Sequence, residues 1–314
     1  MQSDRSLLTA LTHIILDDIQ DGKTLRPEIL GVKDIFDRIC SDFKQGESFI
    51  EFGEVLTPQG LAISPVMAAM CLEDYYRTII YLRGLNAAIV DLKTQHPTRP
   101  LRVLYAGTGP YAILAIPLMS VHSSDCVRFE LLDINAVSLD AVRSIVTQLG
   151  FTESVTAYHQ MDAMQYKHNE AASPDIIIAE IMLAGLEKEP QVAVTRALTT
   201  QMPEALFLPQ SINISAVTDN PRHVLGPVFQ FDSEMFSETV SQEGTLPAAT
   251  LEIPESAKGH ILLETRVKVY QGYELKPYDS GLTSPRILPV DYDPGETLKL
   301  VYQMGEKPGL IRAL

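Results

Sequence analysis

The spacing of hydrophobic residues changes twice along the chain, and each change predicts a different kind of structure. Up to about residue 95, apolar residues recur three and four positions apart, as on one face of a helix. The longest such stretch, 66–92, begins directly after Ser64 and Pro65, a pair typical of a helix start. The segment 96–100 contains two prolines, so it ends the helical part and predicts a linker.

Short apolar segments replace the helical spacing from residue 101 onward. Strands are expected at 101–106, 127–132, 155–159, 175–179 and 205–208, and helices between them at 111–119, 137–149 and 188–200. Strands that alternate with helices in this way indicate a parallel, doubly wound sheet. The strand at 175–179 ends in a run of isoleucines and alanine, which favours a central, buried position.

The alternation stops after Pro209. Strands with alternating or β-branched residues are expected at 211–217, 260–270 and 297–303, separated by turns that contain Pro and Gly. This pattern is typical of an antiparallel β domain. The sequence therefore predicts an α/β protein in three parts, which are a helical N-terminal extension at 1–97, a Rossmann-like domain at 98–209 and a β domain at 210–314.

Charge and cysteine content narrow the possible partners and the compartment. Asp and Glu outnumber Lys and Arg by 40 to 25, which gives a formal net charge of −15. An acidic surface repels nucleic acid and anionic membranes, so neither is expected as a partner. Cys40, Cys71 and Cys126 form no closely spaced pair, which disfavours a disulfide framework or a metal site and favours the cytoplasm.

A glycine turn follows the first predicted strand, from Ala106 to Gly109. Glycines permit a tight turn and leave room for a ligand against the main chain. Asp133 ends the next strand, where its carboxylate can accept hydrogen bonds from the two hydroxyls of a ribose. The turn lacks the third glycine of a dinucleotide site, since Ala112 stands there, and Pro110 crowds it. The pattern favours S-adenosylmethionine, a cofactor without phosphates.

The end of the third strand adds a candidate adenine contact. Asp162 can accept a hydrogen bond from the adenine amino group, although a helix cap is an equally good interpretation of this residue. Turn and strand ends together give the predicted cofactor-binding residues Ala106, Gly107, Thr108, Gly109, Asp133, Ile134, Asp162 and Ala163. A nicotinamide-dependent dehydrogenase and a binding protein without catalysis remain alternative functions for such a pocket.

Two glutamates lie at the expected mouth of this pocket. Glu180 directly follows the central strand, and parallel sheets place their chemistry at the carboxyl ends of strands. Glu189 comes nine positions later, after a loop long enough to return it to the opposite side. Facing carboxylates repel each other unless a cation lies between them, and the planar fork of a guanidinium pairs well with carboxylates. The alternative for 187–189 is an ordinary charged first turn of a helix.

The segment 179–189 resembles the loop of the protein arginine methyltransferase family, in which Ser-Glu-Trp-Met-Gly precedes a second glutamate nine residues after the first. The segment 72–81 is similar to that family's Met-Leu-x-Asp-x-x-Arg-Thr-x-x-Tyr helix. The resemblance implies a class I methyltransferase fold with a β-barrel-like C-terminal domain for substrate binding and dimerisation. It also implies that Arg77, in the N-terminal extension, binds the methionine carboxylate of the cofactor, a pairing that physical chemistry favours.

The sequence departs from the family's pattern in several places. Ile181 and Leu183 replace the tryptophan and the glycine of the loop, and Tyr105 replaces the acid that ends the first strand. The family's Thr-His-Trp loop is missing, because the corresponding segment 280–289 holds no histidine. Asp74, which matches the aspartate that would pair with that histidine, is therefore expected to have another role.

These features predict an S-adenosylmethionine-dependent N-methyltransferase that acts on guanidino groups, with Glu180 and Glu189 as the catalytic residues. The missing Thr-His-Trp loop and the helical extension favour free arginine or a related small guanidine as the substrate. An arginine-containing peptide remains an alternative, as does a natural-product methyltransferase that acts on another oxygen, nitrogen or carbon. The resemblance implies a homodimer, but the segment 219–229, where the family inserts a dimerisation arm, is short.

Overall fold

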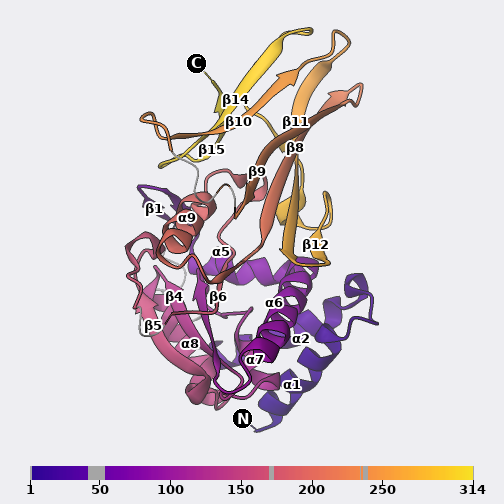
Figure 1. Ribbon diagram of the computed structural model, residues 1–314. Helices are drawn as coiled ribbons and strands as arrows, with labels where there is room; N and C mark the ends of the chain where they lie inside the picture. The colour runs from indigo at the N-terminus through magenta and orange to yellow at the C-terminus, as the bar shows by residue number, and fades with distance from the viewer. Residues whose placement is uncertain (1, 42–53, 170–172, 234, 236–239, 314) are drawn as a thin grey trace.

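The computed structural model describes residues 2–41, 54–169, 173–233, 235 and 240–313. Part of the predicted N-terminal extension, 42–53, thus lies outside the described residues. Figure 1 shows the N-terminal helices and a parallel sheet at one end of the molecule, and antiparallel strands (orange to yellow) that extend from it. The expected α/β fold class, with a Rossmann-like sheet and a C-terminal antiparallel part, is confirmed.

The N-terminal part is mainly helical. Its helices are α1 (Gln2–Leu16), α2 (Arg26–Ile39), α5 (Pro65–Met70) and α6 (Tyr75–Gln95). Ser64 caps α5 by accepting a hydrogen bond from the amide of Met67, as the Ser-Pro pair predicted. The single helix expected at 66–92 is interrupted, because a 3-10 turn and the non-helical Asp74 (ψ 68°) separate α5 from α6. A short hairpin of β1 (Val55–Thr57) and β2 (Gly60–Ala62) was not predicted.

The parallel sheet has the strand order β5-β4-β3-β6-β7. Its strands, at the positions that the apolar segments predicted, are β3 (Leu101–Ala106), β4 (Val127–Asp133), β5 (Val155–Gln160), β6 (Ile176–Ala179) and β7 (Leu206–Leu208). All four residues of β6 are buried, as expected for a strand between two neighbours. The connecting helices are α7 (Ile116–Val121), α8 (Ala136–Gln148) and α9 (Gln191–Gln201).

Two of these helices begin later than predicted. The helix expected at 111–119 is a series of turns up to residue 115, and α7 starts just before Pro117, which is tolerated in a first helical turn. The helix expected at 188–200 begins at Gln191, because Lys188 has a left-handed backbone (φ 68°) and Pro190 precedes the first turn. Residues 187–189 therefore belong to the loop, and their interpretation as a first helical turn is wrong.

The C-terminal strands form two antiparallel sheets. One has the order β12-β11-β8-β9, with β13 beside β11, and the other has the order β10-β14-β15. The strands are β8 (Ser211–Asn220), β9 (Val224–Asp232), β10 (Thr245–Glu252), β11 (Lys258–Tyr270), β12 (Tyr273–Leu275), β13 (Arg286–Ile287), β14 (Thr297–Gln303) and β15 (Gly309–Arg312). The barrel-like closure implied by the resemblance stays a prediction, since these strands are assigned to two separate sheets.

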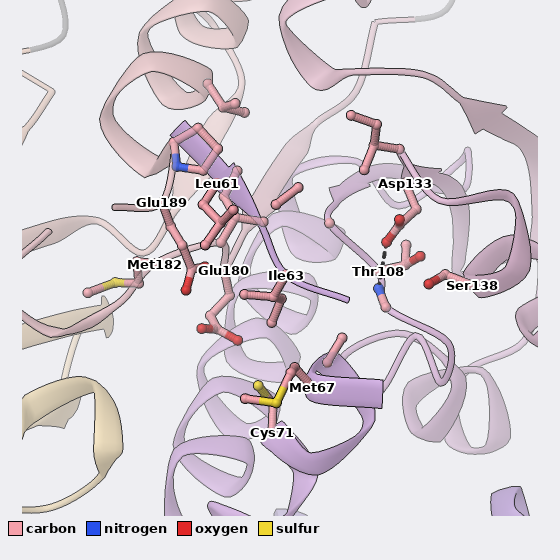
Figure 2. A pocket seen from close by; sticks show the side chains of 18 of the residues that line it. Leu61, Ile63, Met67, Cys71, Thr108, Asp133, Ser138, Glu180, Met182 and Glu189 are labelled. Atoms are coloured by element: carbon pink, nitrogen blue, oxygen red, sulfur yellow. Dashed lines mark hydrogen bonds between the residues drawn. The ribbon is translucent and has the colours of Figure 1, made fainter. Parts of the chain in front are cut away.

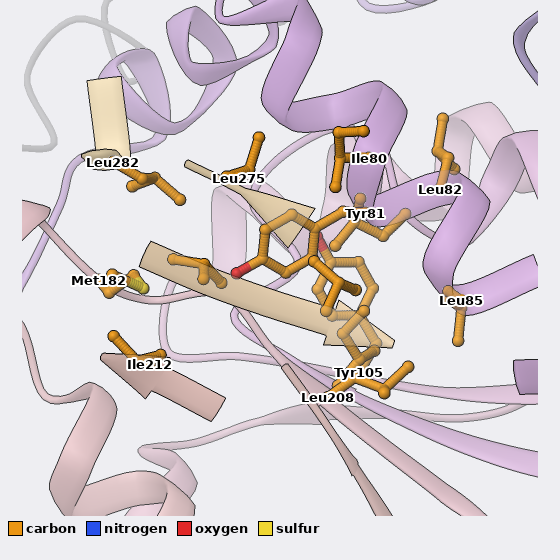
Figure 3. Close-up of a cluster of buried hydrophobic side chains, with 14 of the residues drawn as sticks. Ile80, Tyr81, Leu82, Leu85, Tyr105, Met182, Leu208, Ile212, Leu275 and Leu282 are labelled. Carbon is orange, nitrogen blue, oxygen red and sulfur yellow. The ribbon is translucent and has the colours of Figure 1, made fainter. Parts of the chain in front are cut away.

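Helix α6 connects the parts of the molecule. Gly84 allows close approach to β11, since a Cβ atom there would lie 2.6 Å from Cγ1 of Val269. Figure 3 shows Tyr81 of α6 and Tyr105 of β3 in one apolar cluster with residues of the C-terminal part, such as Leu275. The core is therefore continuous from the helices to the antiparallel strands. Among the described residues, no helix has the length and apolar character needed to cross a membrane.

Short 3-10 turns complete the described structure. They are Gly22–Thr24, Cys71–Glu73, Thr152–Ser154, Ala163–Gln165, Ala184–Leu186 and Gly281–Thr283.

Candidate functional site

A cavity of about 600 Å³ lies at the carboxyl ends of the central parallel strands. Its walls come from the β1–β2 hairpin, from α5 and α6, from the turns after β3, β4 and β5, and from the loop between β6 and α9. Cavities of this size at this edge of a parallel sheet are typical of sites for small molecules and cofactors. The structure brings most of the predicted site residues together around it, namely Arg77, Gly107, Thr108, Gly109, Asp133, Ile134, Asp162, Ala163, Glu180 and Glu189.

The glycine turn and Asp133 form one end of the cavity. Gly107 and Gly109 both have left-handed backbones, with φ of 77° and 58°, which explains the need for glycine at these positions. Asp133 Oδ2 accepts a hydrogen bond from the amide of Gly109 at 2.8 Å (Figure 2). Its Oδ1 accepts one from the amide of Asn135, also at 2.8 Å. Burial raises the pKa of Asp133 to about 6, although these hydrogen bonds oppose the shift.

This end has hydrogen-bonding groups that suit an adenosine. Each Asp133 oxygen accepts one amide and, as a carboxylate oxygen, retains a further lone pair for a ribose hydroxyl. The buried Thr108 hydroxyl lies near Asp133 and helps to lower the pKa of that carboxyl. Asp162 lines the cavity and also caps a 3-10 turn through the amide of Met164 at 2.9 Å, so both interpretations of this residue remain open. Ala106 is fully buried in β3 and is not among the lining residues.

Arg77 connects α6 to the loop that carries the glutamates. Its Nη1 lies 3.4 Å from Oε1 of Glu180, and its Nη2 donates a hydrogen bond to the carbonyl oxygen of Cys71 at 2.9 Å. Burial alone would lower the pKa of Arg77, but the combined effect of Glu180, Cys71 and Asp74 outweighs burial and the pKa is raised. Arg77 therefore forms an ion pair with Glu180, and among the described residues it forms none with Glu73 or Asp74.

Glu180 and Glu189 face the same part of the cavity, on the side away from Asp133 (Figure 2). Burial raises the pKa of Glu180 to about 7, against the opposing effect of Arg77. Burial also raises the pKa of Glu189 to about 8, and the charge of Glu180 adds to this shift. Within the described part of the chain, the Glu189 carboxylate has no hydrogen bond or ion pair. A cation that entered between the two carboxylates would relieve this repulsion.

The segment that replaces the missing histidine loop does return to Asp74. The Asp74 carboxylate accepts a hydrogen bond from the amide of Gly281 at 2.8 Å, and a Cβ atom on Gly281 would lie only 3.2 Å from that carboxylate. Gly281 and Leu282 also line the cavity. The expected other role of Asp74 is thus a backbone contact that holds this segment at the cavity wall.

Several lining residues were not predicted from the sequence. They come from the hairpin and the residue before it, from α5 and α8, and from the loop between β6 and α9, and include Glu54, Leu61, Met67, Ser138 and Lys188. Strands of three residues give too short an alternation to recognise, and the position of Glu54 depends on where the hairpin packs. Glu54 adds a further acidic group near Glu189 and contributes to its raised pKa.

Comparison with solved structures finds proteins that resemble this chain in fold. The structure of PRMT1 in a Trypanosoma brucei enzyme–prozyme complex with AdoHcy is similar at a TM-score of 0.51 and 17% identity, over 76% of this chain and 87% of that chain. Protein arginine methyltransferase 10 of Arabidopsis thaliana gives a TM-score of 0.48 and 15% identity, over 71% of this chain and 84% of that chain. No curated protein sequence matches the chain significantly.

The first structural similarity confirms the predicted methyltransferase fold. At sequence level, the profile of the nicotianamine synthase protein family matches residues 4–236, which is well over half of the chain. This match spans the N-terminal helices, the parallel sheet and the cavity between them. The chain therefore belongs to the nicotianamine synthase family of S-adenosylmethionine-using enzymes.

Proposed function

We propose that this protein transfers a methyl group from S-adenosylmethionine to a guanidino nitrogen of a small molecule, with free arginine as the first substrate to test. The observation that carries the proposal is Glu189, a largely buried carboxylate without a partner among the described residues. It faces Glu180, which already has Arg77. Such a site calls for a second cation, and a guanidinium provides both the charge and a bidentate geometry.

Some residues of the cavity would bind the cofactor, and others would bind the acceptor. Asp133 would hold the ribose, Asp162 the adenine and Arg77 the methionine carboxylate, while the bound cofactor supplies an activated methyl group. Glu180 and Glu189 would hold the guanidinium from two sides and orient one nitrogen towards that methyl group. Positioning of this kind supplies much of the rate enhancement, since the methyl donor is already activated.

One glutamate must also accept a proton. Methylation of a guanidinium, which carries one positive charge before and after the reaction, releases one proton. The pKa of Glu189 is about 8 before a cation binds. This value is close to neutral pH, and a general base is most effective when its pKa is near the working pH. Glu180 lies beside Arg77 and is better placed to keep its charge and orient the substrate.

The size and closure of the cavity support a small acceptor over a peptide. About 600 Å³ must contain both the cofactor and the acceptor. The amide of Leu61, in the β1–β2 hairpin, donates a hydrogen bond to the carbonyl oxygen of Lys188 at 2.7 Å, which closes the hairpin onto the glutamate loop. The hairpin therefore packs beside Glu189 and leaves less room there for a peptide.

An acceptor screen tests the proposal. Free arginine, other guanidines and arginine-rich peptides are incubated with S-adenosylmethionine, and S-adenosylhomocysteine is quantified. Turnover with free arginine, and none with an amino acid such as citrulline, which has no cationic guanidinium, is the expected result. Turnover of neutral acceptors alone would reject guanidine chemistry.

Family membership favours a second candidate function. The nicotianamine synthase family transfers the aminobutyrate group of S-adenosylmethionine, and its profile matches residues 4–236 here. The same cavity would serve that reaction if the acceptor approached a different carbon of the sulfonium. The two candidates leave different by-products, S-adenosylhomocysteine for methyl transfer and methylthioadenosine for aminobutyrate transfer, so mass spectrometry separates them.

Three expectations from the sequence stay predictions. They are the domain boundaries at residues 98 and 210, a homodimer and a cytoplasmic location. Sedimentation velocity on the purified chain tests the homodimer directly.

A further inference from the structure

The loop from Glu180 to Glu189 has an unusual backbone. Gly185, Leu186 and Lys188 all adopt left-handed conformations, with φ of 74°, 55° and 68°. A left-handed backbone is strained for a residue with a side chain, and such conformations persist only where the surrounding structure holds them. The position of Glu189 therefore depends on contacts made outside the loop.

Side chains of the C-terminal strands make several of these contacts, in addition to the hydrogen bond from the Leu61 amide to Lys188. Thr265 Oγ1 accepts a hydrogen bond from the amide of Gly185 at 2.9 Å, and the Tyr302 hydroxyl donates one to the carbonyl oxygen of Leu186 at 2.8 Å. Thr265 and Tyr302 are fully buried, so these bonds are shielded from water. The ring of Tyr302 is stacked on Phe229, with centroids 4.7 Å apart, which fixes the direction of its hydroxyl.

The next two loop residues are held in the same way. Nε of Arg286 donates a hydrogen bond to Oε1 of Glu187 at 2.6 Å, and a second guanidinium nitrogen contacts the same carboxylate. The amide of Lys188 donates to the carbonyl oxygen of Pro308 at 3.0 Å. Four consecutive residues, 185–188, are thus each bound by the C-terminal part of the chain.

The start of the loop is held differently. The Gln191 side chain of α9 accepts a hydrogen bond from the amide of Ile181 at 3.0 Å and donates one to the carbonyl oxygen of Ala179 at 3.1 Å. Glu180 lies between these two residues, so the sheet and α9 fix it. Only the end that carries Glu189 relies on residues beyond 236, where the family match stops.

We infer that Thr265, Arg286 and Tyr302 are positioning residues, which hold Glu189 opposite Glu180 and so specify the acceptor end of the cavity. The kinetic part of this inference rests on the proposed function. The structural part, that the C-terminal strands shape the loop, does not depend on it.

The kinetic test uses the double variant Thr265→Val and Tyr302→Phe in the full-length protein. Both changes keep side-chain size and remove only the polar contacts to the loop. The kcat/KM for arginine is expected to fall about 10–100-fold while the Kd of S-adenosylmethionine changes less than about twofold, since each lost hydrogen bond costs roughly 0.5–1.5 kcal/mol. The pH midpoint of kcat/KM should also move down, because a loosened loop admits water to Glu189.

Two further variants distinguish positioning from general damage. Tyr270→Phe removes a hydroxyl of the same domain that bonds to Asp91, away from the loop, and should keep the kcat/KM and pH midpoint of the wild type. Arg286→Lys should retain more of the kcat/KM than Arg286→Gln, since a lysine keeps the charge opposite Glu187. An unchanged kcat/KM and pH midpoint in the double variant, or an equal loss in Tyr270→Phe, would overturn the inference.

Hydrogen exchange provides a readout that does not require a substrate. The Gly185 and Lys188 amides should be protected in the wild type and exchange at least about tenfold faster in the double variant, while the amides of β3 and β6 stay unchanged. If the wild type methylates no guanidine, the proposed function fails, and exchange alone decides the inference. Unprotected loop amides in the wild type, or equal protection in the variant, would reject it.

Discussion

The cofactor end and the acceptor end of the cavity are built from different kinds of contact. At the cofactor end, Asp133 bonds to the amides of Gly109 and Asn135, which lie on adjacent strand–turn segments. At the acceptor end, the loop before Glu189 is held by Thr265 and Tyr302, which are 80 and 116 residues from their partners. The cofactor end is thus formed by neighbouring strand–turn segments, whereas the acceptor end depends on contacts between residues far apart in the sequence.

The family match covers both ends of the cavity but only part of what holds them. It includes the cofactor end and the loop with Glu180 and Glu189, and it stops at residue 236, before Thr265 and Tyr302. The acceptor end therefore depends on residues outside the matched part of the chain. The following predictions test whether the two ends are as independent as this comparison implies.

The largest expected effect is at the acceptor end. Glu189→Gln should lower kcat/KM for arginine by about 10²–10⁴-fold, because it removes a charge that holds the guanidinium and a proton acceptor. The Kd of S-adenosylmethionine, measured by calorimetry, should change less than about twofold. Glu153→Gln, an exposed glutamate in a separate turn, is the matched control. Retention of more than a tenth of the wild-type kcat/KM would show that Glu189 has no catalytic role.

A change at the cofactor end should weaken cofactor binding and leave kcat nearly unchanged. Asp133→Asn should raise the Kd of S-adenosylmethionine about 10–100-fold, since hydrogen bonds to a charged group contribute roughly 1.5–3 kcal/mol. At saturating cofactor, kcat should stay within about fivefold of the wild type. Calorimetry and steady-state kinetics measure the two quantities. A Kd equal to that of the wild type would remove Asp133 from the cofactor site.

The two ends should also respond to pH in different ranges. Asp133, with a pKa of about 6, is ionised above that pH, so cofactor affinity should rise as the pH rises through 6. Glu189, with a pKa of about 8, attracts a guanidinium only when ionised, so kcat/KM for arginine should rise through 8 and lose this step in Glu189→Gln. Binding of arginine at pH 7.5 should release protons from Glu189. Calorimetry in buffers of different ionisation enthalpy detects this release. If cofactor affinity and kcat/KM for arginine changed with the same pH midpoint, the two ends of the cavity would not titrate independently.

The smallest expected effect is on stability. A carboxyl whose pKa is raised by folding stabilises the fold fully below its unfolded pKa, here about 4.5, and this contribution is lost as the pH rises through the folded value of about 8. Glu189→Gln should therefore raise the Tm of the ligand-free protein by several degrees at pH 8.5 and change it little at pH 5. Thermal unfolding at both pH values measures this, and a lower Tm at pH 8.5 would show that Glu189 is stabilising.

The parts that the sequence predicted well depend on neighbouring residues. Strand β3 has the predicted bounds, because an apolar run followed by a glycine turn is a local signal. The predicted start of α9 was wrong because the left-handed backbone of Lys188 is held by Pro308, a residue 120 positions away. The contact of Asp74 with Gly281 spans 207 positions, so the role of Asp74 could not be derived from segment 72–81 alone.

The lining of the site divides in the same way. The positions of Gly107, Gly109 and Asp133 follow from strand–turn geometry, and the spacing of Glu180 and Glu189 places them at one mouth. The hairpin that covers the cavity is a pair of three-residue strands, too short to give a periodic pattern. Side chains that act through tertiary contacts, such as Tyr302, carry no mark in the sequence that distinguishes them from other core residues.

The most direct test of the central claim is the identity of the two products formed from S-adenosylmethionine and free arginine. Mass spectrometry of a single reaction should show S-adenosylhomocysteine and an arginine 14 Da heavier, the mass of one added CH₂, in equal amounts. Fragmentation should place the methyl group on the guanidino group, and Glu189→Gln should form neither product at a comparable rate. Methylthioadenosine with an aminobutyrate adduct, or a methyl group on any other atom, would contradict the account.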